Sequence, residues 1–217
     1  MSDSPTVAPP VTPRIHTDEN TVLAVNGVSK DFTIRGGMWS RSHDVVHAVD
    51  DVTFTLQKGE TLGIVGESGS GKTTLGRVIV RAHEPTAGTV HIRDHHDDLV
   101  DITAAGPADL KAARRNFHMI FQDPYSSLNP RMTVEEIVGE PLANNLGLKG
   151  SELRDRVVET LELVGLGAQH LARFPHAFSG GQRQRIGIAR SLACRPSLIV
   201  CDEAVSEIGR ASCRERV

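Results

Sequence analysis

A glycine-rich segment holds the residues with the clearest chemical potential. It matches the phosphate-binding pattern G-x-x-x-x-G-K-[ST] and reads Gly66, Glu67, Ser68, Gly69, Ser70, Gly71, Lys72, Thr73 and Thr74. Glycines let backbone N–H groups point at phosphate oxygens, and a helix that starts here adds partial positive charge. Lys72 can reach the β- and γ-phosphates, and the Thr73 hydroxyl can coordinate Mg²⁺. The segment therefore predicts a nucleoside triphosphate site.

The elements around this segment fit such a site. Residues 61–65 (TLGIV) predict a buried strand, and the apolar residues of 75–80 predict a helix. An accidental glycine-rich turn is the alternative, but a chance match in a chain of this length has a frequency of about one per cent. The strand, loop and helix together therefore favour a phosphate cradle.

A second segment ends in two carboxylates. Residues 198–201 (LIVC) form a short apolar run that leads directly into Asp202 and Glu203. This pattern is typical of a parallel strand whose carboxyl end faces a ligand. We expect Asp202 to hold Mg²⁺, directly or through water, and Glu203 to orient and deprotonate a water molecule. Taken alone, the segment is equally consistent with a strand that ends in a solvated turn.

A third segment predicts a helix start with an exposed backbone. It consists of Ser179, Gly180, Gly181 and Gln182. Ser179 suits an N-cap, and the glycines allow a phosphate to approach the backbone. The helix that follows has an apolar stripe of Ile186, Ala189 and Ala193. An ordinary helix cap after a loop is the simpler interpretation of this segment alone.

Together these residues resemble the ATP-binding subunits of ABC transporters. Four motifs occur in the family's order, and they are the phosphate loop at 66–74, the glutamine loop at Gln122, the signature at 178–182 and the acidic strand at 198–203. The resemblance covers residues 21–206. It implies an α/β P-loop NTPase domain with an antiparallel β layer and an inserted helical subdomain at about 123–192. It also implies ATP and Mg²⁺ as ligands.

The resemblance assigns roles to single residues. It implies that Glu203 and Gln122 are catalytic and that Mg²⁺ is held by Thr73, Gln122 and Asp202. In the family two subunits clamp two ATP molecules, so the Ser179–Gln182 segment is expected to act on the ATP of the facing subunit. Phe32 lies where the family places an aromatic residue that stacks on adenine. Packing in the core is an equally good interpretation of Phe32, and Trp39 is a weaker candidate for the stack.

The glutamine loop gives a narrower resemblance. Residues 121–134 (FQDPYSSLNPRMTV) are similar to the dipeptide, oligopeptide and nickel importer branch, as is the segment 32–37. This implies a second ATP-binding subunit, identical or different, transmembrane permease subunits and, indirectly, an extracytoplasmic solute-binding protein. The expected location is the cytoplasmic face of the inner membrane. A soluble ABC-type ATPase of DNA repair or translation is an alternative, but the short stretch between Lys72 and Gln122 leaves no room for its usual insertions. A fragment that at most binds nucleotide is a third interpretation.

Composition bounds the remaining possibilities. The chain has 24 Lys and Arg against 27 Asp and Glu and a net charge of −3, which argues against nucleic acid as a partner. No apolar run approaches the length of a membrane span. The three cysteines show no metal-ligand spacing. His91, His95 and His96 lie among acidic residues, and we expect a solvated hairpin tip there rather than a metal site.

The remaining sequence predicts the order of the elements. Residues 22–25 and 52–56 predict strands of the antiparallel layer, and 117–121 predict a core strand. Leu153, Val157 and Leu161 mark a helix stripe that Gly165 ends. Residues 1–20 contain four prolines among Ser and Thr and predict a disordered lead. Residues 207–217 do not match the family, so we expect the C-terminal part of its core, with its switch histidine, to be missing and the active site to be incomplete.

Overall fold

The amino-terminal half of the fold is an antiparallel sheet with the order β2-β1-β3-β4. The computed structural model describes residues 17–35, 43–120 and 128–202. The strands are β1 (Thr21–Arg35), β2 (His43–Gln57), β3 (Ala87–Arg93) and β4 (Leu99–Asp101). Val25 pairs with Phe54 across β1 and β2, so the predicted antiparallel layer is confirmed. Residues 94–98 form the turn between β3 and β4, as expected for the histidine-rich hairpin tip.

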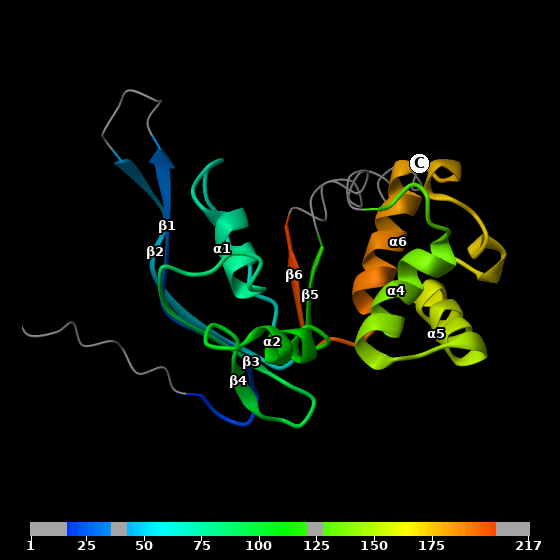
Figure 1. The fold of residues 1–217 in the computed structure, drawn as a ribbon, viewed down its shortest axis with the longest axis horizontal. Helices are drawn as coiled ribbons and strands as arrows, with labels where there is room; N and C mark the ends of the chain where they lie inside the picture. Colours follow the sequence, from blue (N-terminus) through cyan, green and yellow to red (C-terminus); the bar gives the residue numbers. More distant parts are fainter. Residues whose placement is uncertain (1–16, 36–42, 121–127, 203–217) are drawn as a thin grey trace, which may run out of the picture.

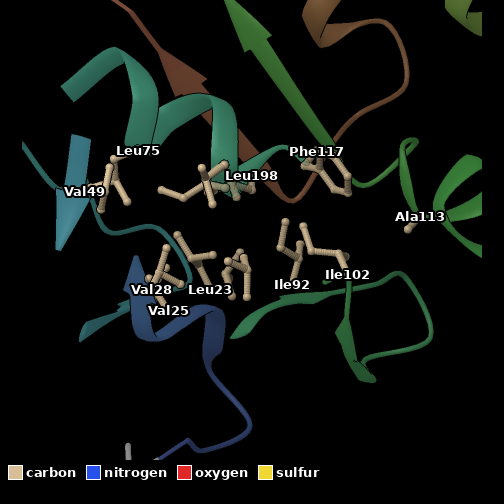
Figure 2. Packing of buried hydrophobic residues seen from close by; sticks show 14 residues of the cluster. Leu23, Val25, Val28, Val49, Leu75, Ile92, Ile102, Ala113, Phe117 and Leu198 are labelled. Atoms are coloured by element: carbon tan, nitrogen blue, oxygen red, sulfur yellow. The ribbon is translucent and has the colours of Figure 1, made fainter. Parts of the chain in front are cut away.

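A second, parallel layer lies across α1 from this sheet (Figure 1). It pairs β5 (Phe117–Ile120) with β6 (Leu198–Cys201), and the other elements here are α1 (Lys72–Ile79) and α2 (Pro107–Ala113). One buried cluster joins the layers. Figure 2 shows Leu23 and Val28 of β1 on one side of this cluster and Leu75 of α1 and Leu198 of β6 on the other, with Phe117 of β5 opposite Ile92 of β3. This packing fixes the phosphate-loop helix between the two sheets.

The helical subdomain is confirmed in the described residues from 128 onward. It contains α4 (Val134–Leu146), α5 (Gly150–Leu163) and α6 (Gly180–Leu192), with short 3₁₀ turns at Ala168–His170 and Pro175–Ala177. Val157 and Leu161 are fully buried, as their stripe predicts, and Gly165 follows α5 in the left-handed region at φ 73°. These helices build a second apolar cluster of their own. In the described ranges no helix has both the length and the apolar character that a bilayer crossing needs.

The strand predicted at residues 61–65 is wrong. This segment is irregular and exposed, with Val65 at 93% exposure and Leu62 and Ile64 at 45% each. A cavity of about 290 Å³ is lined by Leu62 and Ile64 on one side and by residues 198–202 on the other. A strand needs a neighbour for its backbone hydrogen bonds. In the described ranges no strand pairs with 61–65, and the segment stays irregular.

The end of the predicted disordered lead is held by hydrogen bonds. The Asp18 carbonyl accepts a hydrogen bond from the Arg93 guanidinium at 2.7 Å. The Asn20 carbonyl accepts one from the Lys58 backbone N–H at 2.8 Å. The ordered chain therefore begins before residue 20, while residues 1–16 lie outside the described ranges.

Candidate nucleotide site

Two glycines in left-handed conformations shape the phosphate loop. Gly69 has φ 82° and Gly71 has φ 90°, and α1 begins directly after Gly71. A Cβ atom on Gly71 would lie 2.0 Å from the Ala48 carbonyl oxygen of β2. Only glycine fits here, because both the backbone conformation and the close approach exclude a side chain. The loop is therefore seated directly on β2.

The lysine of the loop is held against the loop's own carbonyl groups. The Lys72 Nζ atom donates hydrogen bonds to the carbonyl oxygens of Glu67 at 2.6 Å and Gly66 at 2.9 Å. The Ser70 hydroxyl lies 3.4 Å from the same Nζ atom. A phosphate that approaches the loop thus meets a positive charge whose position is already fixed.

A hydrogen bond joins the loop to the acidic strand. The Thr73 hydroxyl donates to Asp202 Oδ1 at 2.9 Å, although the two residues are 129 positions apart. Hydroxyl and carboxylate oxygens are the ligand types that Mg²⁺ prefers. The predicted Mg²⁺ ligands Thr73 and Asp202 are therefore side by side. Gln122 and Glu203, predicted as catalytic, lie outside the described residues.

No other metal centre competes with this pair in the described part of the chain. It contains no group of three or more His, Cys, Asp or Glu side chains arranged to hold a metal ion, and this includes the turn with His95 and His96. In that turn His95 instead bonds Asn116 at 2.5 Å.

A cavity of about 530 Å³ lies between the loop and β2. Its walls include residues 47–50 of β2 together with Ser70, Gly71 and Lys72. Its volume is in the range of small-molecule sites. No local sequence pattern marks residues 47–50 as part of the site, because their contact with the loop depends on how the loop packs on β2.

Phe32 is half-buried beside this region. The Lys30 Nζ atom lies 5.0 Å from the centroid of its ring, and the His83 ring meets it edge-on at 5.6 Å. Phe32 belongs neither to the buried clusters nor to the cavity lining. Both interpretations of this residue, adenine stacking and packing, therefore stay predictions.

The signature segment caps α6 as predicted. The Ser179 hydroxyl accepts a hydrogen bond from the Gln182 N–H at 3.3 Å, and the Gln182 side-chain oxygen accepts one from the Ser179 N–H at 3.1 Å. A Cβ atom on Gly181 would meet no described atom within 4 Å. The fold itself therefore does not require glycine there. Figure 1 shows α6 and α1 on opposite sides of the β5–β6 pair, so the signature does not face the loop of its own chain.

Known proteins share this arrangement. The ABC transporter family matches residues 49–206. The oligopeptide transport ATP-binding protein AppF of Bacillus subtilis (strain 168) is 46% identical over 192 residues, which cover 88% of this chain and 57% of AppF. The glutathione import ATP-binding protein GsiA of Escherichia coli (strain K12) is 45% identical over 201 residues, which cover 93% of this chain and 32% of GsiA. The chain thus spans between about a third and just over half of these relatives.

Solved structures support the same conclusion. The dimeric post-hydrolysis structure of the ATP-binding cassette MJ0796, bound to ADP and Pi, superimposes with a TM-score of 0.72 at 30% identity. The alignment covers 87% of this chain and 78% of that one. The predicted P-loop fold is thereby confirmed. Since the family match extends over more than half of the sequence and includes both the phosphate loop and the acidic strand, the chain belongs to the ABC transporter family.

Proposed function

We propose that this chain binds and hydrolyses ATP to energise a membrane importer of di- or oligopeptides. The observation that carries the proposal is the 2.9 Å hydrogen bond between Thr73 and Asp202. It places a hydroxyl and a carboxylate together beside the fixed ammonium group of Lys72. This is the donor and acceptor set that a triphosphate with Mg²⁺ requires.

Each residue has a distinct part in this proposal. Lys72 offsets the charge of the β- and γ-phosphates, and Thr73 and Asp202 hold Mg²⁺, with Gln122 as a further ligand. Bound Mg²⁺ supplies charge neutralisation on the phosphoryl group. Glu203 is the carboxylate that orients the attacking water and accepts its proton.

The exposed signature supports a paired assembly. Gly181 faces open space, and the segment lies away from the chain's own loop (Figure 1). We therefore place Ser179, Gly180, Gly181 and Gln182 against the ATP of a second ATP-binding subunit. The names of AppF and GsiA favour peptides over nickel as the solute class. Permease subunits then hold the pair peripherally at the cytoplasmic face of the membrane.

Loss of the loop lysine tests the nucleotide site. Lys72→Ala removes the charge that the loop carbonyls hold in place, so Mg-ATP binding should weaken by about 2–4 kcal/mol, the scale of a lost set of charge-assisted contacts. Isothermal titration calorimetry measures this, with Lys111→Ala on α2 as the matched control because Lys111 is exposed. Equal affinity in wild type and Lys72→Ala would exclude the phosphate loop as the ATP site.

A further inference from the structure

A cavity of about 340 Å³ with both polar and apolar walls lies at the junction of the parallel strands and the helical subdomain. Its walls come from β5, from the C-terminal half of α4 and from the end of α6, with contributions from the ends of α1 and α2. We call it the junction pocket, and its polar lining residues are Arg114, His118, Glu140, Asn144, Asn145, Arg190 and Ser191. None of these residues belongs to the nucleotide site, so the pocket is a separate feature.

The side chains of the junction pocket favour an anion. Two arginines and one glutamate leave it with a net positive charge, and two asparagines add amide donors. Arg190 is largely removed from water, and this burial lowers its pKa, an effect that the nearby Glu140 carboxylate opposes. A bound anion provides a further compensating charge. The net positive charge of the lining therefore favours a ligand with one negative charge.

His118 adds an unused hydrogen-bonding atom. Its Nε2 atom is buried and has no hydrogen-bond partner among the described residues. Burial, followed by the charge of Arg190, lowers the pKa of His118, so its ring is neutral at physiological pH. A buried polar atom without a partner costs free energy, which a polar ligand in the pocket would recover.

The remaining walls are apolar or backbone. Asn116 and Ile120 direct their carbonyl groups to β6, where Leu198 and Asp202 donate to them. Because neighbouring residues of a strand alternate, the backbone groups of Phe117 and Met119, which also line the pocket, point to the opposite edge. In the described residues no strand pairs with that edge. The pocket also has an apolar wall, which consists of Val80, Phe117, Met119 and Pro141.

We propose that the junction pocket binds a small organic carboxylate. Arginine recognises carboxylates with paired N–H donors, and the apolar wall suits a short carbon chain or ring better than a bare inorganic anion. The occupant contacts β5, which leads into the Gln122 segment, and α6, which begins at the signature.

The test uses 4-fluorobenzoate as the probe and follows its ¹⁹F NMR signal on the whole chain without nucleotide or Mg²⁺. We expect saturable broadening that unlabelled benzoate reverses and that ATP leaves unchanged. Arg114→Gln should weaken binding about tenfold, the equivalent of one charge-assisted hydrogen bond. Asn144→Trp should abolish binding by filling the pocket without removing a charge. Both residues are exposed, so the fold should persist, and melting curves check this.

Two controls separate this site from others. Arg154→Gln removes an arginine that is 60% exposed and lies outside the pocket, and it should bind the probe as wild type does. Lys72→Ala should also bind normally, whatever its effect on ATP. The proposal is overturned if wild type shows no saturable broadening, if Asn144→Trp binds like wild type, or if ATP displaces the probe.

Discussion

Replacing Gly71 with alanine should destabilise the chain far more than the same change at Gly69. Both glycines are in the left-handed region, at φ 90° and φ 82°. A Cβ atom on Gly69 would meet no described atom within 4 Å, whereas one on Gly71 would lie 2.0 Å from the Ala48 carbonyl oxygen. Gly69→Ala therefore isolates the conformational penalty, and Gly71→Ala adds a collision with the backbone of β2.

The magnitudes follow from these two terms. Alanine in the left-handed conformation costs about 1–2 kcal/mol, and this penalty is common to both variants. Cβ atoms essentially never approach another heavy atom within 3.0 Å, so Gly71→Ala also requires the loop and Ala48 to separate by 1.0 Å or more. The two nearest atoms are the carbonyl oxygen and carbon of Ala48, which belong to the backbone and cannot rotate away as a side chain would. We expect an additional loss of about 1–3 kcal/mol, the range for inserting atoms into a packed site.

Urea unfolding measures the loss of stability in each variant, and calorimetry with ATP measures whether the loop still binds nucleotide. Gly69→Ala should lower the free energy of unfolding by the conformational penalty alone. Gly71→Ala should lower it further and should also weaken ATP binding, because Lys72 follows directly after the displaced residue. Equal free energies of unfolding for the two variants would refute the claim that the loop is seated on β2.

Two further predictions concern carboxylates. Hydrogen bonds from the Thr133 backbone and hydroxyl to Glu136 at the start of α4 lower the pKa of Glu136. Because its pKa is lower in the folded state, the stabilisation is present above the unfolded pKa of about 4.3 and is lost as the pH falls through the folded value. Between neutral pH and about pH 3 the urea midpoint of Glu136→Gln should thus fall less than that of wild type. If the two midpoints fell equally, the capping box could not be the source of this pH-dependent stabilisation. In a full-length version that includes the rest of the family's core, Glu203→Gln should retain ATP binding, stop hydrolysis and accumulate an ATP-dependent dimer in size-exclusion chromatography, since the amide keeps the shape but not the base. Turnover at the wild-type rate would show that another group is the base.

Local patterns predicted what depends on neighbours in sequence. Ser179 caps α6, and Val157 and Leu161 are buried, because capping and helix periodicity act over a few residues. The strand prediction at 61–65 was wrong because strand formation depends on residues that are distant in the sequence. The apolar, β-branched composition of this segment suits a strand, but strand formation depends on a pairing partner that lies elsewhere in the chain.

In the candidate site, too, local sequence patterns predicted some features, whereas others depend on how separate elements pack together. The glycine pattern predicted the loop, and the run at 198–202 predicted an acidic strand end, which the hydrogen bond between Thr73 and Asp202 joins. The seat of the loop on Ala48 could not be predicted, because it joins backbone groups from separate elements. The junction pocket likewise exists only because β5, α4 and α6 meet.

The separation of the two apolar clusters has a mechanical consequence. The cluster under the sheets and the cluster of α4, α5 and α6 share no residue. The junction pocket lies between the sheets and these helices, and both polar and apolar side chains line it. Because the two clusters share no residue, a rotation of the three helices against the sheets would change the contacts at the junction more than those inside either cluster. The phosphate loop leads into α1 of the first cluster and the signature leads into α6 of the second, so such a rotation would move the two motifs relative to each other.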